Sequence, residues 1–577
     1  GHFKVALRAD ENDVQALTGL GNVAQWRGDS ARALQLLTQA AALAPGDPLI
    51  QASYARAMLD EGMLDFAGRA LDNALAVKPD YALAQALRAE LHVRNEEFLA
   101  AQPMYQSLLE RGEQVAAART GLGDIARALG RYDEAIAHYD EVLITERDLH
   151  HVAVRRADSL ARSGRVVQAI DDLRSYVASH PDSVKAHIGL AQLLVQSGRY
   201  DEAIAIWTAA EARWPDDVSV KAQHALTLDR AGRSDEAVAK AEAAASSPRP
   251  AIAILRARGA LLAGDPAAAV QRLQRIDESR FEDKSLRLAR RRQRMLGLAY
   301  DGLEQWQDAL DAFLQAQRMT ASRLPDLPSL DEDTDALLRQ LGNEPELVDA
   351  RGLPPVLLCG LPGSGVGQVA ALLADQPGWF VRRERFEAMP DFISAPFDPR
   401  LLQPLDQATL AVLARRYRRP LDRARLAEAT QVVDWLPVLD ARVIPAVKRA
   451  LPGTRLLIVA REPQDMLVDW LAFGWSQGYS MPDPLTGARW MRLAAAHLDL
   501  AARMLPVFRA DPDALLAKGG SASRRQLGEY LGLRDVAWGP LARGARRGRG
   551  GLPVCFNAGH AAHYREVLSE AFAALEG

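Results

Sequence analysis

The sequence predicts an α-solenoid of paired helices in the first half of the chain and a three-layer α/β domain with a parallel sheet in the second half. Two observations predict this order. A short pattern recurs at a fixed period through the first half, and two apolar runs in the second half are each followed by a loop and a helix. The 577 residues are 48% hydrophobic and 25% charged, which is the composition of a folded protein.

The repeated pattern recurs about every 34 residues. The copies at 130–135 and 198–203 both read Gly-Arg-Tyr-Asp-Glu-Ala, and Glu96 and Glu304 replace the glycine in two others. Glycine can leave a helix in the left-handed conformation, and acidic residues favour the start of the next helix. Small residues at the end of the pattern let the paired helices approach closely; they are Ala33, Ala67, Ala101, Ala135, Ala169, Ala203, Ala237, Ala269 and Ala309.

This helix–turn–helix period resembles the tetratricopeptide repeat (TPR) over residues 11 to about 321. We count nine repeats, with Phe3–Asp10 as the end of a truncated one, and we assign residues 1–321 to the array. The resemblance implies a superhelix whose concave groove binds a polypeptide or protein. An array that only spaces or dimerises another part of the chain remains the alternative, so a homodimer stays open.

A connector, 322–353, separates the array from the α/β domain, 354–577. Leu324–Pro328 contains two prolines, and Asp331–Asp335 has the acidic residues of a helix start. Beyond the connector, the apolar runs 356–359 and 456–460 are typical of buried parallel strands.

A glycine-rich loop, 360–367, follows the first of these runs and precedes a predicted helix, 368–374. A strand, a glycine-rich loop and a helix present backbone N–H groups and a helix dipole to an anion. The loop lacks the Gly-Lys-Ser/Thr ending of a Walker A sequence.

Several motifs in order resemble the sulfotransferases. Residues 355–365 resemble the phosphosulfate-binding loop, 432–437 an Asp-Lys-x-Pro segment, 451–465 the strand and turn that bind the nucleotide 3′-phosphate, and 559–564 a Gly-x-Trp-x-x-Tyr segment. The second half is therefore similar to bacterial TPR-fused sulfotransferases, relatives of the tyrosylprotein sulfotransferases, which have a P-loop-like fold.

The resemblance implies sulfonyl transfer from 3′-phosphoadenosine 5′-phosphosulfate (PAPS) to a hydroxyl group of a polypeptide that the TPR array presents. Glu384 occupies the position of the general base, although it also fits a surface acid in a charged run. Arg543 begins a basic stretch that could hold the 3′-phosphate or form a solvated loop. The residues that the resemblance assigns to donor binding are Gly360, Pro362, Gly363, Ser364, Gly365, Val366, Gly367, Arg461, Asp469, Arg546, Arg547 and Arg549.

Four departures from the family pattern weaken this assignment. Gly363 replaces a loop cation, Val366 and Gly367 replace two hydroxyl residues, Asp469 replaces a serine, and Trp435 replaces a lysine. A carboxylate about 4 Å from a phosphate charge costs roughly 4 kcal/mol at an effective dielectric near 20. The sequence therefore leaves the enzyme assignment open. The alternatives are a catalytically inactive TPR scaffold and transfer from a different anionic donor.

Composition narrows the remaining classes of function. The net charge of −4 gives no global basic field for nucleic acid, and no apolar run is long enough to span a membrane. Two cysteines fit a reducing compartment, so we expect a cytoplasmic protein. Cys555, His560 and His563 lack a fourth ligand at suitable spacing, so we expect no metal.

Overall fold

The computed structural model describes most of the chain. The described residues are 2–26, 29–277, 286–320, 324–348, 350, 353–382, 392–393, 397–423, 431–475, 479–534, 536–545, 547–548 and 550–576. The chain divides into two compact units, Gly1–Thr227 and Leu228–Gly577, which we call the first and second units. The last repeats therefore belong to the same compact unit as the sheet.

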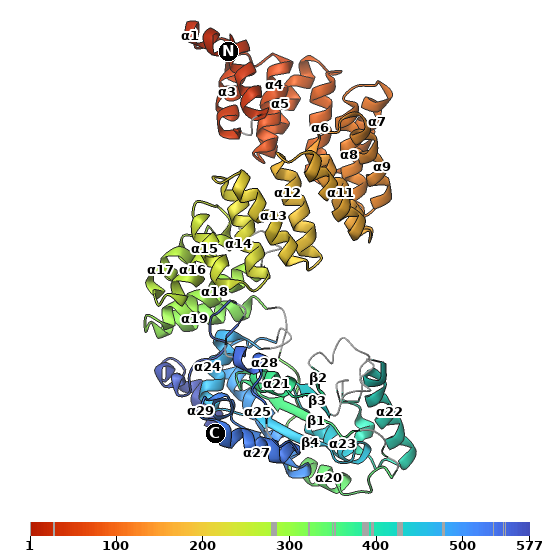
Figure 1. Cartoon of the computed structure of the whole chain (residues 1–577), viewed down its shortest axis with the longest axis vertical. Coiled ribbons are helices and arrows are strands. Elements are labelled where there is room, and N and C mark those ends of the chain that lie inside the picture. Colours follow the sequence, from red (N-terminus) through yellow and green to blue (C-terminus); the bar gives the residue numbers. More distant parts are fainter. Residues whose placement is uncertain are drawn as a thin grey trace. The chain divides into compact units, whose positions relative to one another are not determined.

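The first unit consists of antiparallel helix pairs that follow one another along the chain (Figure 1). A short helix, α1, precedes the first pair, and α14 crosses the boundary between the units. The helices are α1 (His2–Ala9), α2 (Val14–Trp26), α3 (Ser30–Leu43), α4 (Pro48–Asp60), α5 (Leu64–Val77), α6 (Ala82–Arg94), α7 (Phe98–Glu110), α8 (Val115–Ala128), α9 (Tyr132–Thr145), α10 (His150–Arg162), α11 (Val166–Ser179), α12 (Val184–Gln196), α13 (Tyr200–Arg213) and α14 (Val218–Arg230).

The second unit begins with the last repeats and continues into the α/β part. Together with α2–α14, the helices α15–α19 form nine pairs within the described residues. The helices are α15 (Ser234–Ala243), α16 (Pro250–Leu262), α17 (Pro266–Gln274), α18 (Leu286–Asp301), α19 (Trp306–Arg318), α20 (Glu332–Gly342), α21 (Val366–Ala374), α22 (Gln407–Arg423), α23 (Ile444–Ala450), α24 (Pro463–Phe473), α25 (Pro484–Met504), α26 (Pro512–Leu516), α27 (Ser521–Leu531), α28 (Pro540–Gly544) and α29 (Ser569–Glu576).

The repeat pattern acts as the sequence predicts. The recurring alanines are fully buried between the paired helices, at 0% exposure. Gly130 and Gly198 have φ angles of 74° and 72°, and Glu96 and Glu304 take the same left-handed conformation, with φ angles of 62° and 59°. The turn geometry is therefore kept even where a side chain makes it less favourable.

The described α/β part holds one parallel sheet of five strands. They are β1 (Val356–Gly360), β2 (Trp379–Arg382), β3 (Gln431–Leu436), β4 (Arg455–Val459) and β5 (Val507–Ala510), and their order is β2-β3-β1-β4-β5. The strand order therefore reverses at β1, because β3 lies on one side of it and β4 on the other. In sheets of this kind, ligands bind beyond the carboxyl ends of the strands at the point of reversal.

Helices cover both faces of the sheet (Figure 1). Leu357 and Cys359 of β1 face a core formed with α20, α22, α23 and α25. Val356 and Leu358, on the opposite face, pack with α21, α26, α27 and α28. The parallel sheet predicted from the apolar runs is confirmed, and Cys359 is a buried core thiol at 1% exposure.

The last repeat packs directly on the α/β part. Gln317 of α19 donates to the carbonyl oxygens of Trp470 and Leu471, at 2.7 and 3.0 Å. The predicted connector is anchored as well, because Trp490 donates to the carbonyl oxygen of Pro325 at 2.8 Å. Asp331 caps α20 by accepting from the Thr334 amide at 2.8 Å.

Candidate functional site

The glycine-rich loop makes a tight turn between β1 and α21. Gly363 and Gly365 have φ angles of 75° and 77°, and Gly365 caps the amino end of α21. A Cβ atom on Gly363 would lie 2.0 Å from the carbonyl oxygen of Met466 in α24. No side chain fits there, so the close approach of α24 explains why this position holds no cation.

A cavity of about 250 Å³, the loop cavity, lies beside this loop, which lines it from Leu361 to Gln368. Ser364 is fully buried, and its Oγ has no hydrogen-bond partner among the described residues. The indole N–H groups of Trp435 and Trp475, which also line the cavity, are unpartnered in the same sense. The loop cavity therefore offers donors, without a side-chain cation in its described wall.

The side chain of Arg461, the predicted 3′-phosphate ligand, is buried and hydrogen-bonded to other residues of the chain. Its Nη1 donates to Asp469, its Nε donates to Asp513 at 2.9 Å, and its Nη2 donates to the carbonyl oxygen of Phe556 at 3.0 Å. The side chains of Arg461 and Asp469 are only 3% and 2% exposed. The cation expected to bind a phosphate thus has two carboxylate partners.

Asp469 is held by more than this ion pair. The backbone amide of Phe556 donates to its Oδ1 at 2.8 Å. Burial raises the pKa of Asp469 to about 7, although the Phe556 amide and Arg461 favour its charged form. Burial also raises the pKa of the neighbouring Cys555 thiol, whose sulfur lies 3.0 Å from Gln368 Nε2.

Asp434 and Trp435 lie at the carboxyl end of β3. Asp434 is fully buried and accepts from the Tyr417 hydroxyl, and its Oδ1 lies 3.8 Å from Arg382 Nη1. The following Trp435 points to the loop cavity, with a Gly367 Cβ position 3.5 Å from its ring. This segment therefore supplies an apolar wall where the resembling family has a lysine.

Part of the predicted site lies outside the described residues, namely Glu384, Arg546 and Arg549. Arg547 is exposed, and its backbone pairs with Pro553 in a short antiparallel bridge. The residues that the structure does bring together at the loop cavity are Pro362, Gly363, Ser364, Gly365, Val366, Gly367 and Asp469.

The 559–564 segment joins the repeats to the α/β part. The amides of Gly559 and Ala561 donate to Asp465 at 2.6 and 2.9 Å. His560 Nε2 and the Tyr564 hydroxyl both contact Asp301 of α18, at 2.8 and 2.7 Å. His560 is thus used in packing, and the described residues hold no group of three or more potential metal ligands.

Sequence reasoning missed several residues of this site. Asp513 follows β5, and Cys555 and Phe556 lie far along the chain from Arg461. The Asp511-Pro512-Asp513 sequence signals only a helix start, because the contact with Arg461 depends on the pairing of β4 with β5.

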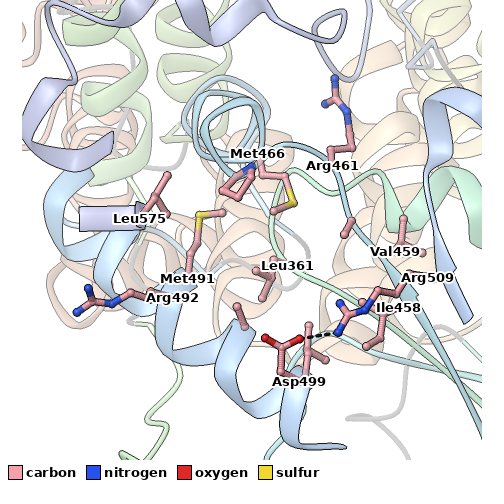
Figure 2. A pocket seen from close by; sticks show the side chains of 14 residues that line it. Leu361, Ile458, Val459, Arg461, Met466, Met491, Arg492, Asp499, Arg509 and Leu575 are labelled. Carbon is pink, nitrogen blue, oxygen red and sulfur yellow. Dashed lines mark hydrogen bonds and ion pairs between the residues drawn. The ribbon is translucent and has the colours of Figure 1, made fainter. Parts of the chain in front are cut away.

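A separate cavity of about 200 Å³ lies beside the carboxyl end of β4 (Figure 2). Met466 and Met491 line its mainly apolar wall, and the Asp499–Arg509 ion pair, at 2.5 Å, lies at one end. Figure 2 shows Arg461 at the edge of this cavity with its guanidinium directed away from Met491. This cavity suits an apolar group better than an anion.

The first unit contains a larger cavity of about 780 Å³, lined mainly by α6, α8 and α10, which we call the repeat groove. Asp124 in the groove accepts from Arg155 at 2.6 Å and from the Tyr139 hydroxyl at 2.7 Å. Burial raises the pKa of Asp124, although Arg155 and Tyr139 favour its charged form. The polar lining of the groove is therefore fixed by contacts between repeats.

Comparisons with known proteins agree with the repeat assignment. Family models described as tetratricopeptide repeat match residues 27–91, 87–148 and 154–218. No curated protein matches the chain. No helix in the described ranges has the length and hydropathy that a bilayer crossing requires.

Several solved structures of repeat proteins are similar to the chain. A tetratricopeptide repeat protein from Parabacteroides merdae is 18% identical, with 50% of this chain and 98% of that chain covered and a TM-score of 0.29. YrrB, a TPR protein with an unusual peptide-binding site, is 18% identical, with coverages of 32% and 96% and a TM-score of 0.23. A TPR protein from Thermus thermophilus is 22% identical, with coverages of 37% and 98% and a TM-score of 0.25.

Proposed function

We propose that this protein, which contains tetratricopeptide repeats, is a scaffold that binds an extended polypeptide in the repeat groove. The observation that carries the proposal is the groove itself, a cavity of about 780 Å³ whose lining has charged groups of both signs. Repeat arrays use such concave surfaces to bind extended chains.

The chemistry of the groove suits a peptide backbone with mixed side chains. Arg56 of α4 and Glu90 of α6 line it, as do Thr120 of α8 and Arg155 of α10. Guanidinium groups can bind carbonyl or carboxylate oxygens, and carboxylates can accept from backbone amides. The Asp124–Arg155 ion pair holds two of these groups in place before a ligand arrives, which lowers the entropic cost of binding.

A blocking substitution tests this proposal. Ala117 is an exposed small residue of the groove lining, so Ala117→Arg should fill the groove without disturbing the core. Ala100→Arg is the matched control, because Ala100 is exposed on α7 and does not line the groove.

Peptides selected from a displayed random library against the wild-type chain provide the ligands. We expect Ala117→Arg to weaken their binding by at least about tenfold in fluorescence anisotropy, as expected for the loss of one well-packed contact. Ala100→Arg should bind as the wild type does. Equal binding by both variants, or selection of no binding peptide, would refute the proposal.

A second candidate function is sulfonyl transfer from PAPS to a polypeptide hydroxyl group. In it, the loop cavity would hold the phosphosulfate, and Glu384 would take the proton of the hydroxyl as adenosine 3′,5′-bisphosphate leaves. The unpartnered Ser364 hydroxyl of the glycine-rich loop favours it. The pairing of Arg461 with Asp469 and Asp513 opposes it, because an incoming phosphate must compete with two carboxylates.

Calorimetric titration with adenosine 3′,5′-bisphosphate distinguishes the two candidates, since it requires no acceptor. The scaffold proposal expects no binding in the loop cavity at millimolar ligand. Micromolar binding that Arg461→Ala abolishes would instead establish a working donor site, provided that the variant keeps the wild-type far-UV circular dichroism. The search for acceptors would then turn to the peptides selected on the groove.

A further inference from the structure

A third cavity of the second unit is lined by arginines. Its volume is about 370 Å³, and it lies between α16, α18, the end of α24 and the residues Gly548, Gly550, Leu552 and Pro553. The guanidinium groups that line it are those of Arg258, Arg287, Arg290, Arg291 and Arg294. We call it the arginine pocket.

Few acceptors balance these cations. Asp229 accepts from Arg258 at 2.5 Å and from Arg291 at 3.2 Å. Arg290 donates to the Thr320 hydroxyl at 3.3 Å, and Arg294 donates to a backbone carbonyl at the end of α24 at 3.2 Å. Among the described residues, Asp229 is thus the one carboxylate that pairs with any of the five arginines of the pocket wall.

Arg258 is the least satisfied of these residues. Its side chain is 2% exposed, and its Nε and Nη2 have no hydrogen-bond partner among the described residues. A Cβ atom on Gly550 would lie 2.9 Å from its Nη1, so the backbone at Gly550 lies against it. Buried donors without partners are costly, and a ligand that accepts from them removes that cost.

The positive charge also affects the arginines themselves. Burial, followed by the nearby charge of Arg290, lowers the pKa of Arg294 to about 10. Arginine pairs with phosphate through two parallel N–H···O bonds, so several arginines around one cavity fit adjacent phosphate groups. Opposite the arginines, Leu298 and Phe473 give the pocket an apolar wall.

We propose that the arginine pocket binds a small molecule with at least two adjacent phosphate groups. The volume lies within the range of small-molecule pockets, and the backbone at Gly548 and Gly550 limits the space for a larger ligand. Inorganic pyrophosphate and the diphosphate group of a nucleotide share this chemistry. The apolar wall would contact only the second.

The test is calorimetric titration of the full-length chain with ADP, inorganic pyrophosphate and inorganic phosphate. We expect pyrophosphate and ADP to bind in the micromolar range, and phosphate to bind at least about tenfold more weakly because it engages fewer arginines. Tighter binding of ADP than of pyrophosphate would support a nucleotide, and equal binding would support the inorganic ion. Equal binding of phosphate and pyrophosphate would overturn the proposal, as would no binding at millimolar ligand.

Charge reversal locates the site. Arg287 is exposed and Arg290 half-buried, so Arg287→Glu with Arg290→Glu should leave the fold intact and weaken pyrophosphate binding by at least about a hundredfold. The matched control is Arg318→Glu, an exposed arginine of α19 outside the pocket, which should bind as the wild type does. Equal losses in both variants would indicate a non-specific charge effect and refute the site.

Two other ligands, single-stranded RNA and adenosine 3′,5′-bisphosphate, must be distinguished from a small diphosphate by experiment. Single-stranded RNA that displaces ADP and binds more tightly would overturn the small-molecule assignment. Adenosine 3′,5′-bisphosphate bound in the loop cavity would be insensitive to the Arg287 and Arg290 substitutions. The arginine pocket and a donor site are therefore distinguishable, and neither result depends on a peptide in the repeat groove.

Discussion

Replacing Asp469 with serine should turn Arg461 from an internal ion-pair partner into a group that can bind an anion. Breaking a buried ion pair by removing one partner costs about 3–5 kcal/mol. Arg461 keeps Asp513 at 2.9 Å, so we expect the lower end, about 3 kcal/mol, in urea unfolding above the pKa of about 7 that burial gives Asp469, where the pair is charged. The loss of the Phe556 amide's acceptor is part of this cost.

The same substitution should create anion affinity. A carboxylate about 4 Å from a phosphate charge contributes roughly 4 kcal/mol of repulsion at an effective dielectric near 20, so its removal should strengthen binding by about a thousandfold. Adenosine 3′,5′-bisphosphate at a hundred times its dissociation constant should then restore about 2.7 kcal/mol of the lost stability.

The control is Asp499→Ser, which removes an exposed ion pair with Arg509 and should cost less than about 1 kcal/mol. Unfolding curves with and without ligand, together with calorimetry, measure both effects. An Asp469→Ser variant that is as stable as the wild type would refute the ion-pair reasoning. A variant that loses stability and gains no anion affinity would show that Arg461 cannot reach a ligand.

Three further predictions concern the same site. Gly363→Ala should lower the free energy of unfolding in urea by more than about 3 kcal/mol, because its Cβ would overlap the Met466 carbonyl at a positive φ. Gly367→Ala, the control, should lower it by less than about 1 kcal/mol. Equal losses would contradict the close approach of α24. Ser364→Ala should keep or increase stability, because it removes a buried hydroxyl without a partner; a loss above about 1 kcal/mol would reveal a bond to that hydroxyl. Because the pKa of Asp469 is raised in the folded state, that state binds more protons than the unfolded chain between about pH 4 and 7. The free energy of unfolding should therefore fall with rising pH in this range, by up to about 1.4 kcal/mol per pH unit. Asp469→Asn should remove that slope.

The repeats could be predicted from the sequence because each turn is a local event. A glycine, an acidic pair and a buried alanine fix one hairpin without help from distant residues. Glu96 and Glu304 support the same conclusion, since they adopt the left-handed backbone conformation at the positions where other repeats have glycine. The period therefore carried more information than the residue type.

The α/β part was predictable only where its signals were local. The apolar runs of β1 and β4 predicted buried strands, and the loop after β1 predicted an anion-binding turn. The arginines of α18 received no function from the sequence, because their significance depends on Gly550, which lies against Arg258 and is far from both along the chain. Contacts of this kind connect residues hundreds of positions apart, which a local pattern cannot register.

Gly363 and Asp469 also need the structure, because the sequence presents them as two unrelated losses. The structure relates both to α24, because this helix approaches Gly363 through the Met466 carbonyl and carries Asp469 three residues later. A buried guanidinium must have an acceptor, and Asp469 supplies Arg461 with one from within the chain. Because Arg461 is already paired with Asp469, a cation on the loop would have no bound anion to neutralise. The backbone of α24 at Met466 also fills the space that its side chain would need. The two departures are therefore one consistent arrangement, in which the protein's own carboxylate pairs with the arginine for which the sequence predicted a phosphate ligand.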